Sequence, residues 1–169
     1  MIERTHSLRW ARRLIKIGFR ARISLKAIGK DSTTIATCEG IASNDEEVKD
    51  LMITAMSRGA WRTISGFVTT WLRIEKWVSK EGSTHDSIYP LKASTMTSCV
   101  YAQVKNDCRP SVPSLLIRTG RWIADRAGFE ILGSLEDALI KGMIERESQR
   151  SKYSSSSRSR SSPSTRSNA

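Results

Sequence analysis

The sequence predicts an all-α protein. In the middle of the chain, apolar residues recur at steps of three and four, the spacing that places side chains on one face of a helix. We find no convincing alternation of apolar and polar residues, the pattern typical of a half-buried strand. Residues that favour helix ends, such as Asn44, Ser111 and Gly128, stand between the periodic stretches.

The 169 residues carry a formal net charge of +11 that is unevenly distributed. Residues 1–30 hold nine Lys or Arg and one acid, whereas residues 31–50 hold six acids and one Lys. Residues 51–150 are nearly balanced, and residues 151–169 have four basic side chains and no acid. We therefore expect a basic amphipathic helix or arm (1–30), a linker (31–45), a helical domain (46–150) and a disordered Ser/Arg-rich tail (151–169).

The composition favours a polyanionic partner and gives no support to a metal, a cofactor or a membrane. Clustered cations attract polyanions such as nucleic acid, although a merely soluble basic surface has the same composition. Cys38, Cys99 and Cys108 form no CxxC pair, and His6 and His85 lie far apart, so we predict no metal site and no cofactor. No apolar run approaches the length of a membrane span, so we predict no membrane partner.

The first basic segment, 7–30, has helical periodicity with an apolar side and a basic side. Three interpretations are open. It is an arm that follows nucleic acid, a transit peptide for import into an organelle, or an accessory helix with a solvated basic face.

The segment WRTISGFVTTWLRIEKWV (61–78) predicts the central helix of the core. Its large apolar side chains form one stripe, which includes Trp61, Ile64, Val68, Trp71 and Val78. A second, polar line at helical spacing is displaced from this stripe and consists of Arg62, Ser65, Thr69, Arg73, Lys76 and Lys80. The tryptophans are therefore assigned to packing, and the basic line is left for a partner.

Three more helices are expected after the loop that contains Gly82 and Pro90. The first covers roughly 94–106 with Ser94 as a candidate cap, and the second runs from Ser111 to about Ala127 with Arg118 and Arg121 on its outer side. The third opens at SLED (134–137), which matches a capping box. Its buried line is predicted to be Leu135, Leu139, Gly142 and Met143, with Ile140 and Ile144 alongside. Lys141 and Arg146 are expected on flanking positions.

The order of these signals resembles the N-terminal core-binding, SAM-like domain of the tyrosine recombinases, the phage-integrase family. The segments that carry the resemblance are IEKWVSKEG, IYPLKASTMTSCVYAQV, PSVPSLLIRTGRWIADRAGF and LEDALIKGMIERESQR. Met96 and Val100 replace leucines that are commoner in the family pattern. The resemblance covers about ninety residues of the chain and implies a small four-helix bundle that clamps one side of duplex DNA, here with an additional N-terminal basic helix.

The resemblance also implies which residues contact DNA. Basic side chains on these helices would grip backbone phosphates and groove edges; the candidates are Arg62, Arg73, Lys76, Arg118, Arg121, Lys141 and Arg146. The family's catalytic domain needs an HxxR-type pair and a nucleophilic Tyr. No His follows His85, and Tyr153 lies in the Ser-rich tail. We therefore predict no catalytic residue, no enzyme activity, and no cutting or rejoining of DNA by this chain.

An RNA-associated or protein-interaction adaptor is the alternative function. It would use the basic arm together with the tail, whose Arg-Ser alternation resembles a short RS segment that phosphorylation could neutralise. The expected location is the nucleus or the cytoplasm, with organelle import through residues 1–30 as a further possibility.

Overall fold

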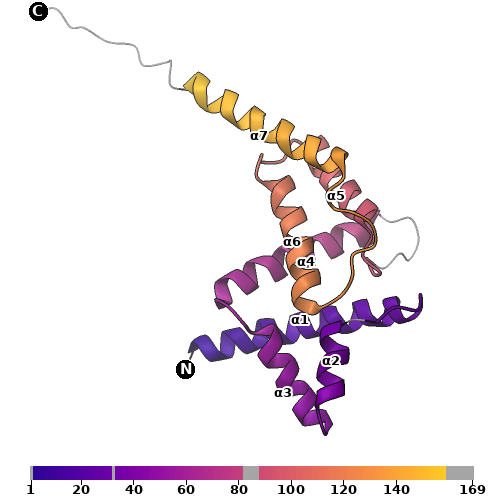
Figure 1. Cartoon of the computed structure of the whole chain (residues 1–169). Coiled ribbons are helices and arrows are strands. Elements are labelled where there is room, and N and C mark those ends of the chain that lie inside the picture. The colour runs from indigo at the N-terminus through magenta and orange to yellow at the C-terminus, as the bar shows by residue number, and fades with distance from the viewer. Residues whose placement is uncertain (1, 32, 82–87, 159–169) are drawn as a thin grey trace, which may run out of the picture.

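The computed structural model describes residues 2–31, 33–81 and 88–158, and in these ranges it contains helices and no strand (Figure 1). The all-α prediction is therefore confirmed. An isolated parallel bridge joins Lys92 to Leu132. The helices are α1 (Ile2–Lys26), α2 (Thr33–Ile41), α3 (Asp45–Met56), α4 (Trp61–Glu81), α5 (Ala93–Lys105), α6 (Val112–Ala127) and α7 (Ala138–Arg158).

Helix α1 lies in the middle of the arrangement. It packs against α4 and α6 and also against α3, and in Figure 1 the pair α2 and α3 extends downward from it. Helix α4 packs against α6, and α5 and α7 complete the upper part of the fold. The N-terminus lies at one side, beside the start of α1, and α7 reaches away from the body at the end opposite α2 and α3 (Figure 1).

The predicted apolar stripe of α4 forms the centre of the main core. Ile64, Val68 and Trp71 are completely buried, and Ile74 and Val78 continue the same line. Trp61 is only half-buried at the start of the helix. Removing large side chains of this kind from water stabilises a fold by roughly 1.5–3 kcal/mol each, so α4 supplies much of the driving force for folding.

Helix α1 belongs to this core and is not a free arm. Ala11, Leu14 and Ile17 are completely buried in the same cluster as Trp71. Gly18 permits a close approach, because a Cβ there would lie 3.1 Å from Ile35 Cδ1 and 3.4 Å from the Ala127 carbonyl oxygen. Of the three interpretations, the accessory helix describes this packing best. However, α1 contributes buried side chains to the main core, which an accessory helix need not do.

The segment 31–45, predicted to be a linker, contains helix α2, which corrects that prediction. Only two of its apolar side chains, Ile35 and Cys38, are buried, and they pack on Met52 in a small second core. A strong ionic contact also holds the segment, since the buried Arg22 guanidinium donates to Asp31 at 2.5 Å and to Glu39 at 2.6 Å. Too few apolar residues fall within α2 to produce a recognisable period.

Several predicted helix ends are confirmed and others are not. The Asn44 side chain accepts a hydrogen bond from the Glu47 amide, and Gly128 ends α6 in the left-handed conformation with φ of 70°. Ser111 precedes α6 without a side-chain hydrogen bond to it. The Ser94 cap is wrong, because α5 already begins at Ala93. Gly82 and most of its loop lie outside the described residues.

The last helix starts later and ends later than the sequence predicts. The capping box at 134–137 is wrong, since α7 begins at Ala138 and the Asp137 carboxylate accepts from the Leu139 amide at 2.7 Å. Its buried side is formed by Ile140, Met143 and Glu147, while Leu139 is 59% exposed. The helix continues to Arg158, past the predicted boundary at 150, and the rest of the predicted tail lies outside the described residues.

Gly128→Ala should destabilise the protein strongly. The left-handed backbone disfavours any Cβ, and a Cβ at this position would lie 2.6 Å from the Thr34 backbone nitrogen. We expect a loss of at least about 2 kcal/mol in the free energy of unfolding, measured by urea denaturation. The matched control is Gly142→Ala on α7, where a Cβ meets nothing within 4 Å. That change should stabilise by about 0.5–1 kcal/mol, and equal effects at the two glycines would contradict the packing described here.

Candidate nucleic-acid interface

Two of the predicted contact residues, Arg62 on α4 and Arg118 on α6, line one groove. Its volume is about 460 Å³, and its other walls are formed by Thr63, Gly66, Phe67, Thr70 and Leu115. The groove exists because the apolar stripes of α4 and α6 face each other and leave the adjoining polar edges of both helices side by side. Guanidinium and hydroxyl groups are the donors that phosphate oxygens accept from, so the groove is suited to an anion.

A stack of four side chains runs beside this groove. The Arg118 guanidinium carbon lies over the Phe67 ring at 5.6 Å, and Phe67 stacks on Trp122 with 4.7 Å between ring centroids and 17° between planes. Arg126 closes the stack at 5.1 Å from the Trp122 ring. A stacked guanidinium keeps the N–H groups at its edge available for a partner, so the rings orient the arginines without using up their donors.

Arg126 lies near the connection that carries Arg58, since a Cβ at the next residue, Gly59, would lie 4.0 Å from the Arg126 Nη2 atom. Burial lowers the pKa of Arg126 first, and the positive charge of Arg58 lowers it further, while Asp125 acts in the opposite direction. Two guanidinium groups close enough to repel each other gain free energy when an anion lies near both. We call Arg58, Arg62, Arg118 and Arg126 the α4–α6 cationic face.

Sequence reasoning did not single out Arg58 or Arg126. Arg126 was detectable in principle, since it follows Arg118 by eight residues and Trp122 by four, which places the three on adjoining parts of one helix surface. Arg58 lies in the short connection between α3 and α4, where no period assigns a direction to a side chain.

The other predicted cations do not join this face in one continuous wall. Arg121 donates to Glu136 at 3.4 Å, and Lys141 lies 3.8 Å from the same carboxylate, so these two form a separate group. Arg146 follows Lys141 by five residues, about 140° around α7, and therefore lies on the other flank of that helix. The seven candidates thus divide between several parts of the surface.

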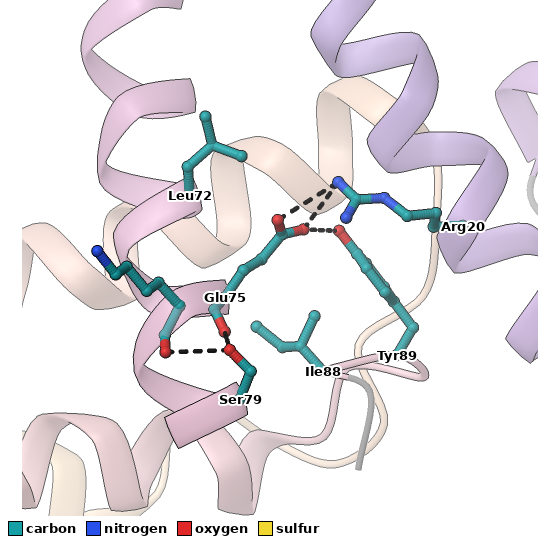
Figure 2. A pocket seen from close by; sticks show the side chains of 7 residues that line it. Arg20, Leu72, Glu75, Ser79, Ile88 and Tyr89 are labelled. Atoms are coloured by element: carbon teal, nitrogen blue, oxygen red, sulfur yellow. Dashed lines mark hydrogen bonds and ion pairs between the residues drawn. The ribbon is translucent and has the colours of Figure 1, made fainter. Parts of the chain in front are cut away.

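Arg73 and Lys76 continue the exposed line of α4 beyond Arg62. Arg73 is eleven residues further along, which is roughly 16 Å of helix. Lys76 also borders a second hollow of about 400 Å³, lined by Arg20, Leu72, Glu75, Ser79, Ile88 and Tyr89 (Figure 2).

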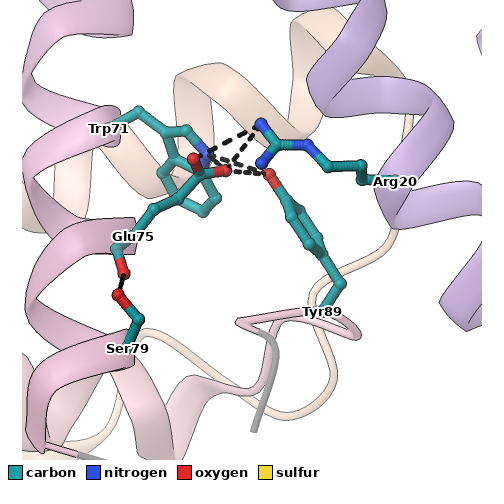
Figure 3. Close-up of polar contacts among 5 residues, drawn as sticks. All are labelled: Arg20, Trp71, Glu75, Ser79 and Tyr89. Atoms are coloured by element: carbon teal, nitrogen blue, oxygen red, sulfur yellow. Dashed lines mark hydrogen bonds and ion pairs between the residues drawn. The ribbon is translucent and has the colours of Figure 1, made fainter. Parts of the chain in front are cut away.

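The wall of this second hollow is a polar network around Glu75, which we call the Glu75 network (Figure 3). Its oxygen Oε1 accepts from the Trp71 indole N–H at 2.9 Å and from the Tyr89 hydroxyl at 2.5 Å. The Arg20 guanidinium lies 3.1 Å from the same oxygen, and the Trp71 N–H also reaches the Tyr89 oxygen at 3.0 Å. The network therefore ties α1, α4 and the segment before α5 together.

The charges and hydrogen bonds of the network compensate one another inside the fold. Burial raises the pKa of Tyr89 well above its ordinary value, and the nearby negative charge of Glu75 raises it further, while Arg20 acts in the opposite direction. The Glu75 carboxylate is mostly covered and has three donors around it, so its charge is compensated inside the fold. Sequence analysis did not single out Glu75; its spacing of four from Trp71 is the one signal that could have found it.

No family model, curated protein or solved structure matches this chain. The resemblance to the recombinase core-binding domain stays a prediction. In the described ranges, His, Cys, Asp and Glu side chains nowhere gather in threes or more as a metal ion would require. None of the helices described in the structure has the length and apolar character needed to cross a bilayer.

Tyr89→Phe should show a stability deficit that shrinks at high pH. Near neutral pH the change removes the hydroxyl of the network and should cost about 1–3 kcal/mol. Above a pH of about 10 the phenol ionises in the unfolded chain but stays protonated in the fold, so the wild type loses up to about 1.4 kcal/mol of this advantage per pH unit.

Urea unfolding of both proteins at pH values of about 8 and about 11 measures this difference. Tyr101→Phe, at a position 58% exposed, is the matched control for loss of a phenol outside the network. A deficit of Tyr89→Phe that is the same at both pH values would contradict a buried, protonated Tyr89.

Proposed function

We propose that this chain is a non-catalytic module that grips duplex DNA through backbone phosphates, with the α4–α6 cationic face as the main contact. The observation that carries the proposal is the meeting of Arg62 and Arg118 in one groove, although they come from helices separated by the whole of α5. Phosphate contacts of this kind supply most of the affinity of sequence-tolerant DNA binding.

The aromatic stack favours duplex backbone over single-stranded bases. Single-strand binders present open ring faces on which bases stack. Here Phe67 and Trp122 stack on each other, and each ring also has a guanidinium group over it, Arg118 over Phe67 and Arg126 over Trp122. The rings are therefore already occupied, and the edges of the guanidinium groups are the parts that meet a partner.

The exposed line of α4 extends the proposed contact along the duplex. Arg62, Arg73 and Lys80 are exposed at helical spacing, and the line is roughly 27 Å long at 1.5 Å per residue. Arg121 and Lys141 share Glu136, so we assign them a secondary role at the edge of the contact, and Arg146 a role outside it.

A nuclear or cytoplasmic location fits this proposal better than import by a cleaved leader. Residues 11–25 of α1 include five buried side chains of the main core, so cleavage after residue 30 would remove one wall of it. A reporter fused to residues 1–30 tests the import interpretation directly.

Arg62→Ala and Arg118→Ala should each weaken DNA binding by roughly five- to tenfold and reduce the slope of log affinity against log salt by about one. Fluorescence anisotropy with two unrelated duplexes measures both quantities, and the two duplexes should give similar affinities. The control is Lys26→Ala, which removes the same charge from the C-terminal end of α1 and should change affinity by less than about twofold.

Salt-independent binding, or binding that is unchanged by both arginine substitutions, would contradict this proposal. The alternative adaptor function predicts a different outcome, because there the arm and the tail would bind. Truncation after Arg158, where α7 ends, separates the two, since loss of nucleic-acid binding in that variant supports the adaptor.

A further inference from the structure

An apolar hollow lies between α1 and α3, on the part of the fold that Figure 1 shows below α1. Its volume is about 630 Å³, and α2 contributes Glu39 to its rim. Its apolar lining consists of Ile15, Phe19, Val48, Met52 and Ile53. Phe19 is 40% exposed, a large fraction for an aromatic side chain inside a hollow. We call this site the α1–α3 groove.

The apolar lining continues along α1 beyond the groove itself. Ile15, Phe19 and Ile23 follow one another at steps of four, and Ile23 is 71% exposed. Eight residues of helix span about 12 Å, so the apolar surface is an elongated stripe. An elongated stripe suits a helix that presents side chains at i, i+3, i+4 and i+7 better than it suits a compact ligand.

The rim of the groove is mainly positive. Its charged lining residues are the cations Arg12, Lys16 and Lys49 and the acids Glu39 and Asp45. Of the two acids, Glu39 is bound by the Arg22 guanidinium at 2.6 Å, so its charge is already compensated. A neighbouring hollow of about 490 Å³ shares Arg12 and Lys16 and adds Leu8, Arg9 and Arg13, which extends the positive surface along α1.

We propose that the α1–α3 groove binds an amphipathic helix of a partner protein, with its apolar face on Phe19 and an acidic edge turned towards α1. A helix can place acids on one edge only and so keep them away from Asp45, Glu46 and Glu47 in the first turn of α3. A phosphate backbone offers no apolar ridge for Phe19. An anionic bilayer offers apolar chains but spreads its charge over a plane, so it would also bring negative charge towards these three acids. The site is separate from the α4–α6 cationic face and does not depend on the proposed DNA binding.

The test is a selection from a displayed library of helical peptides with the full-length chain as bait. The library fixes leucines at i, i+3, i+4 and i+7 and varies the flanking positions among Glu, Lys and Ser. We expect Glu to be enriched along one edge. The best peptide should lose at least about tenfold in affinity to Phe19→Glu and to Lys16→Glu, measured by anisotropy.

Lys16 is exposed, so Lys16→Glu tests the charge match even if Phe19→Glu perturbs folding. The matched control is Leu139→Glu, which places the same charge at a hydrophobic position of α7 that is 59% exposed, and it should leave peptide affinity unchanged.

Enrichment of Lys, absence of any binder, or binders that tolerate both groove substitutions would overturn the proposal. So would binding of anionic vesicles that is lost in Phe19→Glu while peptide binding is retained. Phe19→Glu should bind DNA as tightly as the wild type. A failure of the peptide-binding proposal can therefore be distinguished from a failure of the DNA-binding proposal.

Discussion

The indole N–H of Trp71 is buried at the centre of the fold, where water cannot satisfy it, and the structure meets this demand with Glu75 and Tyr89. A buried donor without a partner would cost about 1–3 kcal/mol, and a buried carboxylate without compensation would cost more. The Arg20 guanidinium supplies that compensation from α1, at 3.1 Å from Glu75. The need to satisfy the Trp71 N–H therefore holds together three parts of the chain: α1, α4 and the segment before α5.

The orientation of α4 follows from this constraint. With Trp71 held inward by its ring and its N–H, the opposite line of the helix, which begins at Arg62, has to face outward. Helix α6 packs beside it, and Phe67 on Trp122 sets the spacing at which Arg62 and Arg118 meet. The proposed DNA contact is thus a consequence of how the core is packed, although its residues lie on the surface.

Periodicity was enough to predict the buried and exposed lines of α4, because both repeat along one helix. It was not enough for α2, which buries only Ile35 and Cys38 and depends on Met52 from another helix. The predicted buried line of α7 included Leu139, which is exposed, whereas Ile140, expected only beside that line, is buried. Glu75 and Arg126 were missed for a shared reason, since a charged residue at the edge of an amphipathic helix has the same sequence pattern whether it is solvated or buried.

A double-mutant cycle between Glu75→Ala and Tyr89→Phe tests the central constraint most directly. The free energy of unfolding of the wild type, both single variants and the double variant is measured by urea denaturation at neutral pH. If the two side chains act as one network around the Trp71 N–H, the cycle should give a coupling energy of at least about 1 kcal/mol. If the destabilisation of the double variant equals the sum of the two single variants to within about 0.3 kcal/mol, the two side chains act independently. That result would contradict the network as the feature on which the rest of the fold depends.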